Sequence, residues 1–300
     1  MVSLHALAGP FGVEIRGIDL ARPLSRNDER AIIDALHDNQ AIVVRGQSLN
    51  ADQFLRYGEC FGRPHPHVLD HLHLPGYPGI LPLTNVAPDG GAERNYNGAA
   101  FWHTDQSYEA EPASATILYA IKLPAVGGGT QIPNMALAYD ALGETMKKRV
   151  DGLTVLHRYG NRDAGRPEEN DATPLADERQ RRKVPPVRHA LVRRHPVTGR
   201  KALYAPTGTS RGILGMPEDE ARDLLGELRD HALKPAFRHA HKYATGDVIA
   251  WDTLATVHRA PDQKAATGPA DTRLLHRISV KGLPPCLGWV QGDGQERETA

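Results

Sequence analysis

A histidine and an aspartate stand two positions apart in FWHTDQSY, residues 101–108, as His103 and Asp105. In a β-strand, side chains at i and i+2 point to the same face, so both could be directed at one object. An imidazole and a carboxylate are both metal ligands, so that object could be a metal ion. Such a short pattern also fits a surface or structural pair, and a metal site requires a third ligand.

A third ligand is available in DVIAWDTLATVHRA, residues 247–260, where a strand is expected to end near Trp251 and His258 follows. Two histidines and one carboxylate form the triad of non-haem iron(II) oxygenases, which leaves coordination positions open for chemistry. We predict that His103, Asp105 and His258 are metal ligands and form the catalytic centre. Trp102 and Trp251 are expected to be core residues rather than substrate contacts.

Two arginines in RLLHRISVKG, Arg273 and Arg277, are four residues apart and would share one face of a strand with Leu275. A guanidinium binds a carboxylate through two parallel hydrogen bonds. Because the triad with Fe(II) would carry a net charge of about +1, it would favour an anionic co-substrate nearby. The alternative for Arg277 is a structural salt bridge.

The formal net charge of the 300 residues is zero, with 36 basic and 36 acidic side chains. This balance gives no general attraction to nucleic acid or to an anionic membrane. Cys60 and Cys286 form no CxxC pair, which argues against a disulfide framework and a cysteine-built zinc site. Without a signal sequence or an 18-residue apolar run, we expect a cytoplasmic protein with neither nucleic-acid nor membrane partners.

Short apolar runs separated by glycine and proline are typical of short strands joined by turns. Helices are expected from the caps Ser25 and Asn50 and after Pro217, where acidic residues suit the helix dipole. We predict a mainly β fold, a sandwich or barrel with flanking helices. Strands are expected at 13–20, 41–46, 114–123, 189–195, 201–205, 247–252 and 273–282, with a turn at 195–200.

Residues 160–186 are polar, rich in proline and glycine, and nearly free of large apolar side chains, so they cannot supply core. They form either a disordered surface loop or a lid that orders over bound substrate. We expect residues 1–290 to form one domain and residues 291–300 to be a disordered tail.

Several ordered blocks resemble the taurine dioxygenase/2,4-D dioxygenase (TauD/TfdA) family of Fe(II)/2-oxoglutarate-dependent dioxygenases, from about residue 10 to residue 285. The resemblance implies a double-stranded β-helix, or jelly roll, with the metal at its mouth. It also implies Fe(II), 2-oxoglutarate and O2 as cofactor and co-substrates, hydroxylation of a C–H bond with release of succinate and CO2, and homo-oligomers. The blocks are WHTDQSY (102–108), ILYAIKLPAVGGGTQIPNMALAYDAL (117–142), HPVTGRKALY (195–204), GDVIAWDTLATVHRA (246–260) and RLLHRISVKG (273–282).

The resemblance also implies roles for single residues, with the three predicted metal ligands matching the iron ligands. Arg273 matches the arginine that binds the far carboxylate of 2-oxoglutarate, and Thr130, after the glycine run, matches the threonine that supports this carboxylate. Arg277 matches the arginine that binds the substrate's anionic group. His67 falls where some members place a substrate-contacting histidine, although HPHVLDHLH also fits a solvated loop.

Two segments depart from the taurine-using pattern. The segment before WHTD ends in Ala99, Ala100 and Phe101 where those members are polar, and Asp70 stands where they have a tyrosine. A pocket with fewer polar donors favours a larger or more apolar substrate than taurine.

We expect the substrate to be a small to medium organic anion, such as an alkyl sulfate, a sulfonate or an aryloxyalkanoate. The alternative is a natural-product tailoring oxygenase that acts on a carboxylated scaffold. A zinc hydrolase and a non-catalytic binding protein are the alternatives from other classes.

Overall fold

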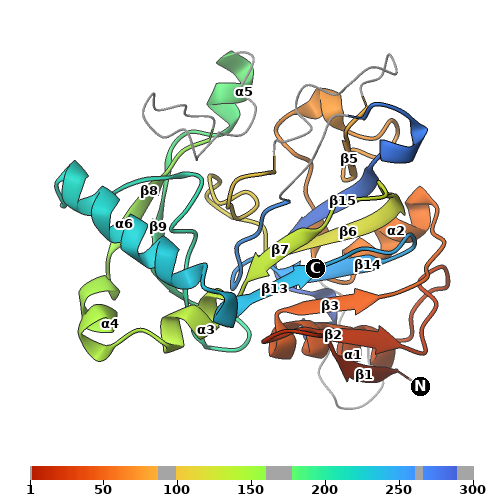
Figure 1. Cartoon of the computed structure of the whole chain (residues 1–300), viewed down its shortest axis with the longest axis horizontal. Helices are drawn as coiled ribbons and strands as arrows, with labels where there is room; N and C mark the ends of the chain where they lie inside the picture. Colours follow the sequence, from red (N-terminus) through yellow and green to blue (C-terminus); the bar gives the residue numbers. More distant parts are fainter. Residues whose placement is uncertain (1, 87–98, 160–177, 261–265, 289–300) are drawn as a thin grey trace.

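An eight-stranded sheet is the largest element of the computed structural model, which describes residues 2–86, 99–159, 178–260 and 266–288 (Figure 1). The strands follow the order β1-β2-β3-β14-β6-β15, and the short strands β4 and β5 both pair with β15. The β2–β3 pair is parallel, and the other pairs are antiparallel. The strands are β1 (Ser3–Ala6), β2 (Val13–Arg16), β3 (Ala41–Val44), β4 (Arg63–Pro64), β5 (Leu81–Thr84), β6 (Ala115–Lys122), β14 (Val248–Asp252) and β15 (Leu274–Lys281).

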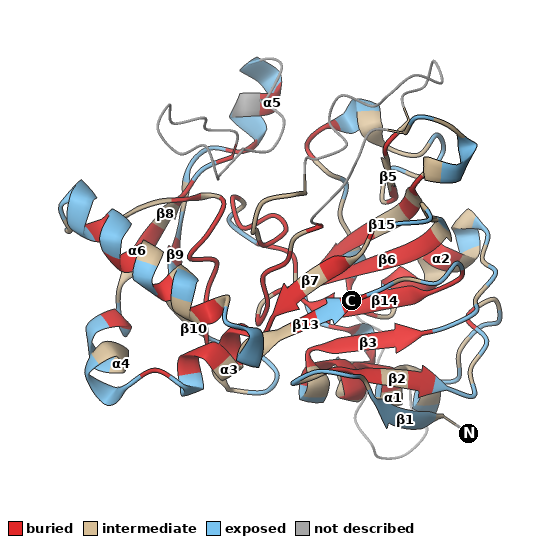
Figure 2. Ribbon diagram, in the orientation of Figure 1, coloured by how far each residue is buried: buried red, intermediate tan, exposed pale blue. Residues whose placement is uncertain are grey.

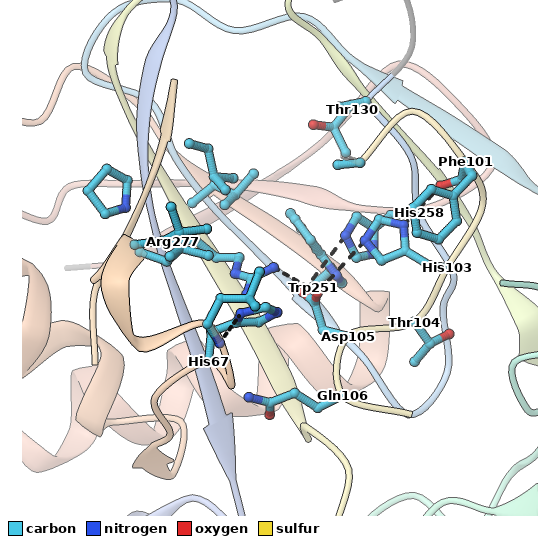
Figure 3. Close-up of a pocket in the computed structure, with 18 of the residues that line it drawn as sticks. His67, Phe101, His103, Thr104, Asp105, Gln106, Thr130, Trp251, His258 and Arg277 are labelled. Atoms are coloured by element: carbon cyan, nitrogen blue, oxygen red, sulfur yellow. Dashed lines mark hydrogen bonds and ion pairs between the residues drawn. The ribbon is translucent and has the colours of Figure 1, made fainter. Parts of the chain in front are cut away.

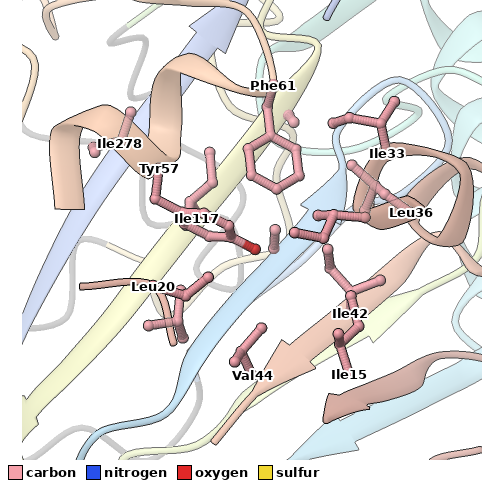
Figure 4. Packing of buried hydrophobic residues seen from close by; sticks show 14 of the residues in the cluster. Ile15, Leu20, Ile33, Leu36, Ile42, Val44, Tyr57, Phe61, Ile117 and Ile278 are labelled. Atoms are coloured by element: carbon pink, nitrogen blue, oxygen red, sulfur yellow. The ribbon is translucent and has the colours of Figure 1, made fainter. Parts of the chain in front are cut away.

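Both faces of this sheet are apolar, because alternate residues of its central strands belong to two different cores. In β3, Ile42 and Val44 pack in one core, whereas Val43 packs in the other. The first core is closed by α1 (Arg26–Asn39) and α2 (Ala51–Glu59), as Figure 4 shows. The central strands are therefore buried along their length (Figure 2).

A smaller sheet packs on the second face. It pairs β7 (Thr130–Pro133) with β13 (Arg238–His241), and Ile132 of β7 lies in the core of that face. Isolated bridges join residue 131 to residue 259 and His103 to His258. The predicted double-stranded β-helix is thus confirmed, and an isolated bridge beside its smaller sheet brings together two predicted ligands that are distant in sequence.

The segment between β7 and β13 forms a second layer, at the left of Figure 1. The turn predicted at 195–200 is confirmed, because it joins β10 to β11 in a hairpin. The core of this layer includes Val257, next to His258, so the layer supports the loop that carries this ligand. The elements are α3 (Met135–Asp140), α4 (Glu144–Val150), β8 (Thr154–His157), α5 (Glu178–Lys183), β9 (Val187–Ala190), β10 (Val192–Arg194), β11 (Lys201–Leu203), β12 (Ser210–Ile213) and α6 (Glu218–Ala232).

The predicted helix starts are confirmed by their caps. The Ser25 hydroxyl accepts a hydrogen bond from the Asp28 backbone N–H, and Asn50 forms a reciprocal capping box with Gln53. Helix α6 follows Pro217 with three acidic residues in its first turn. Four 3₁₀ turns, counted over the described residues, lie at Asp70–Leu72, Pro235–Phe237, Pro269–Asp271 and Pro285–Gly288.

Two strand predictions are wrong by more than the one or two residues at the ends by which the others differ. The strand expected at 13–20 ends at Arg16, and the one expected at 189–195 is split between β9 and β10, which pair in different sheets. The predicted tail and residues 160–177 of the predicted loop lie outside the described residues. Among the residues that the structure describes, no helix has the length and apolarity to cross a membrane.

Candidate active site

The three predicted ligands His103, Asp105 and His258, here called the cavity triad, converge in the wall of a cavity (Figure 3). Nε2 of His103 lies 3.8 Å from Oδ1 of Asp105, and Nε2 of His258 lies 3.8 Å from Oδ2. Two metal–ligand bonds of about 2.1 Å span up to about 4.2 Å, so one ion can bridge each of these pairs.

The local structure at this pair differs from the prediction. His103 makes a single bridge with His258, and Asp105 already belongs to a turn, so the pair does not lie on a regular strand. The turn is closed by the Ser107 backbone N–H, which donates to the Thr104 carbonyl at 3.3 Å. The two side chains therefore converge through a bridge that enters a turn, rather than through strand alternation.

Hydrogen bonds orient the ligand atoms of His103 and Asp105. Nδ1 of His103 lies 2.9 Å from the Phe101 carbonyl and donates to it, which leaves the Nε2 lone pair available for a metal. The Thr116 hydroxyl donates to Oδ2 of Asp105 at 2.7 Å, and Nη1 of Arg277 donates to Oδ1 at 3.0 Å. The carboxylate is thus held in place before any metal binds.

The protonation states of the three side chains of the cavity triad also suit a divalent cation. Burial alone would raise the pKa of Asp105, but the charges of Arg277, His258 and His103 and the Thr116 hydroxyl hold that pKa below its usual value. Burial lowers the pKa of His258 to about 3 and also lowers the pKa of His103. At neutral pH the set is one carboxylate and two neutral imidazoles, which is the state that ligates a metal.

The predicted residues Arg273 and Thr130 line the same cavity. Arg273 is 6 % exposed, its Nε donates to the Gly128 carbonyl at 3.4 Å, and no carboxylate of the described residues forms an ion pair with it. The Thr130 hydroxyl lies 2.8 Å from the Tyr243 hydroxyl. A side chain at Gly129 would place its Cβ 2.7 Å from the His241 carbonyl, which explains the glycine before Thr130.

Arg277 and His67 also reach the cavity. Arg277 pairs with Asp105, as the structural alternative expected, yet this contact uses only one of the five N–H groups of its guanidinium. Burial, and then the charge of Arg277, lowers the pKa of His67 to about 3. Because Nδ1 of His67 accepts from the Leu69 backbone N–H at 3.2 Å, the proton of the neutral ring lies on Nε2, which can donate.

The rest of the cavity wall is mostly apolar, and it includes Ala99 from the segment that departs from the taurine pattern. Trp251 is fully buried in the core of the second sheet face, as expected, and it reaches the cavity wall with its ring centroid 4.7 Å from that of His258. Trp102 instead stacks under Arg259. The apolar and aromatic lining residues are Leu69, Leu72, Leu81, Pro82, Leu83, Ala99, Phe101, Tyr108, Leu118, Tyr159, Trp251 and Ala260.

The described end of the predicted loop lies against this wall. Asp70 does not line the cavity; it forms ion pairs with Arg179 at 3.4 Å and Lys183 at 3.6 Å, both in α5. Val184, which follows α5, packs with the cavity residues Leu69 and Tyr108 in a small cluster.

Several residues at the site were not predicted from the sequence. Thr116, Tyr243 and Gln106 touch or line the site, but none stands in a pattern that a single sequence makes visible. A second His/His/Asp group was also missed. His37, His195 and Asp252, here called the interior triad, are buried away from the cavity, and their potential ligand atoms also lie within 4.8 Å of one another.

Comparison with known proteins agrees with the oxygenase-type metal site that the geometry of the cavity triad indicates. The family model described as "Taurine catabolism dioxygenase TauD, TfdA family" matches residues 3–279. The chain belongs to this family.

Two relatives and one solved structure illustrate the membership. The alpha-ketoglutarate-dependent 2,4-dichlorophenoxyacetate dioxygenase of Burkholderia sp. (strain RASC) is 32% identical, over 96% of this chain and 98% of the relative. Pentalenolactone F synthase of Streptomyces arenae is 29% identical, over 90% of this chain and 91% of the relative. The crystal structure of AAD-2 with Mn(II) and N-oxalylglycine has a TM-score of 0.80 at 26% identity, and covers 94% of this chain and 97% of that one.

Family membership makes the protein an Fe(II)/2-oxoglutarate-dependent dioxygenase, an oxidoreductase that uses O2. The donor set of the cavity triad, two imidazole nitrogens and a carboxylate, fits Fe(II). The alternatives of a zinc hydrolase and a non-catalytic binding protein find no support in these relatives.

Proposed function

We propose that the protein hydroxylates a C–H bond of a small to medium organic anion with an aryl or alkyl body. His103, Asp105 and His258 hold Fe(II), which together with 2-oxoglutarate and O2 supplies the oxidising power, with succinate and CO2 as co-products. The chain's own residues bind and orient the two organic molecules and exclude water from the reacting centre.

The observation that carries the proposal is the unpaired guanidinium of Arg273. Burial lowers the pKa of Arg273, but an arginine stays protonated in proteins, so a full charge is buried. A buried charge without a partner is costly, and no described carboxylate supplies that partner. The far carboxylate of 2-oxoglutarate completes the pair, with the Thr130 hydroxyl as a further donor that Tyr243 orients.

The substrate's anionic group is bound by Arg277, whose remaining N–H groups can donate to it, and by the Nε2–H of neutral His67. Leucine and aromatic side chains form the wall around these donors. An anion with an apolar body matches this combination. The compound in the name of the Burkholderia relative, 2,4-dichlorophenoxyacetate, has that chemistry.

A tailoring role in biosynthesis is the second candidate, because the apolar wall would equally accept a carboxylated hydrocarbon scaffold and one relative is a pentalenolactone F synthase. Turnover of several short aryloxy acids, sulfonates or alkyl sulfates would favour the first candidate. Turnover confined to one polycyclic acid would favour the second.

The loop at 160–186 acts as a lid in this proposal, tied at its described end by α5 to Asp70. Ordering of the lid would lower its protease sensitivity when Fe(II), 2-oxoglutarate and substrate are added together. Unchanged cleavage would count against the lid. Single-domain organisation, a cytoplasmic location and homo-oligomer formation likewise stay predictions.

The test is succinate release from metal-free protein given Fe(II), 2-oxoglutarate and air, across aryloxy acids, sulfonates, alkyl sulfates and terpenoid acids. Two variants test the separate roles of the two arginines. Arg273→Met should mainly raise the KM for 2-oxoglutarate, and Arg277→Met should mainly raise the KM for the organic anion. No substrate-stimulated succinate with any class, or equal effects of both variants on both KM values, would contradict the assignment.

A further inference from the structure

Gln106 follows Asp105 and lines the cavity, on the opposite side of Asp105 from Thr130 in the view of Figure 3. Its side chain is 2 % exposed, and neither Nε2 nor Oε1 has a hydrogen-bond partner among the described residues. Buried polar groups in native proteins are almost always hydrogen-bonded. Both ends of this carboxamide therefore call for a partner that the described residues do not supply.

A second glutamine in the same backbone conformation shows what a structural role looks like. Gln40 has a φ of 57° and Gln106 a φ of 54°, in the left-handed region that glutamine rarely adopts. Gln40 is also buried, but its Nε2 donates to the His37 carbonyl at 2.6 Å and its Oε1 accepts from Asn134 at 2.8 Å. Both amide atoms of Gln40 are hydrogen-bonded, whereas neither amide atom of Gln106 has a partner in the part of the chain that the structure describes.

A second unpartnered polar atom lies in the same wall. Tyr108 is 5 % exposed, lines the cavity, and its hydroxyl has no hydrogen-bond partner in the described part of the chain. Its ring packs against Tyr159, with centroids 4.4 Å apart, so the ring is held in the wall. Together Gln106 and Tyr108 offer N–H, O–H and C=O groups, and neither carries a charge at neutral pH.

We propose that Gln106, with Tyr108, forms a subsite that hydrogen-bonds an uncharged polar substituent on the body of the substrate. A hydroxyl, amide or carbonyl group fits, because the subsite presents neutral donors and acceptors, while the positive charge of Arg277 serves the anionic group. This inference rests on the proposed function and deepens it. The substrate is then an organic anion whose apolar body carries a second, neutral hydrogen-bonding group.

The experiment uses phenoxyacetates that carry either a hydroxyl or a methyl group at the ortho, meta or para position. For each pair, the kcat/KM values from succinate release give a hydroxyl-to-methyl ratio. A site built to hydrogen-bond a substituent rejects the analogue that lacks it. We expect a ratio of about 10 or more at one ring position. Gln106→Met should bring that ratio to about 1, because methionine keeps the length of the side chain and removes its hydrogen bonds.

Two further variants keep the test decisive. Gln106→Asn retains a carboxamide in a residue type that tolerates the left-handed conformation, and it should retain part of the preference. Gln40→Met removes the satisfied glutamine, and it should leave the ratio unchanged even if the protein becomes less stable. Dissociation constants of the same acids, measured with N-oxalylglycine in place of 2-oxoglutarate, should show the same ratios without turnover.

The possible failures are distinguishable. Turnover of the phenoxyacetates with a ratio near 1 at every ring position would overturn the subsite and leave the proposed function standing. A preference that survives in Gln106→Met would also overturn it. No succinate with any organic anion would overturn the proposed function, and the subsite with it.

Discussion

The cavity triad and the interior triad contain the same residue types, but their lone pairs are used differently. In the cavity triad the two Nε2 atoms lie 3.8 Å from the carboxylate, too far for a hydrogen bond. In the interior triad, Nε2 of His195 lies 3.0 Å from Oδ2 of Asp252. Nδ1 of His195 accepts from the backbone N–H groups of Val197 and Thr198, so Nε2 carries the proton and donates to the carboxylate.

Within the interior triad, His195 and Asp252 therefore form a structural hydrogen bond, and the His37 ring packs beside His195 at a centroid distance of 5.3 Å. The hydrogen bond joins the 195–200 turn to the end of β14, and Oδ1 of Asp252 accepts from the Leu254 backbone N–H, in the loop that leads to His258. The cavity triad instead keeps its lone pairs directed at one point. Residue types alone suggest two metal sites, and the hydrogen bonds of His103 and His195 distinguish them.

The largest effect is expected from His258→Ala, which removes a ligand of the cavity triad. Substrate-stimulated succinate release should fall by more than about 10²-fold, because metal-centred catalysis supplies several kcal/mol. The matched variant His37→Leu, in the interior triad, should retain most of the activity in the folded protein. Comparable losses in both variants would remove the distinction between the triads.

The next effect is on stability. His195→Ala leaves Asp252 buried without its partner, which should lower the free energy of unfolding by about 3 kcal/mol. Urea denaturation measures this loss, and the iron content of the folded fraction should stay the same. Unchanged stability would show that the interior hydrogen bond does not hold the hairpin to β14.

A smaller effect should follow from Thr116→Val, which removes the hydroxyl that orients Asp105 without changing side-chain size. Iron affinity should fall about 10–100-fold, as is typical for partners of metal ligands. Thr253→Val removes the next hydroxyl, which donates to Thr116 rather than to Asp105, and it should weaken iron binding less. Equal losses would mean that the hydroxyl bound to Asp105 has no special role.

The smallest effect concerns His157, a buried histidine outside both triads. Burial, and then neighbouring positive groups, lowers its pKa to about 3, whereas the unfolded chain binds this proton near its ordinary value. Between those values the unfolded state binds more protons, so stability falls as the pH falls. Between pH 7 and 5 this histidine should account for a loss of at most about 2 kcal/mol, which His157→Asn should remove. Urea titrations at both pH values test this, and an equal loss in the variant would exclude His157 as its source.

Much of the fold was predictable, because the central strands are continuous apolar runs and the caps Ser25 and Asn50 are local signals. The small sheet was not predicted, since β7 and β13 are four residues each and their pairing depends on the whole fold. At the site, the sequence motifs WHTDQSY (102–108) and GDVIAWDTLATVHRA (246–260) identified the candidate ligands. Gln106, Thr116 and Tyr243 could not be found, because their roles arise from three-dimensional neighbours.

The central claim is that the cavity triad alone holds the iron. Its most direct test is the number of iron ions bound per chain in anaerobically reconstituted wild type, Asp105→Ala and Asp252→Asn. We predict one ion in the wild type, none in Asp105→Ala and one in Asp252→Asn. Iron retained by Asp105→Ala, or lost from folded Asp252→Asn, would contradict the claim.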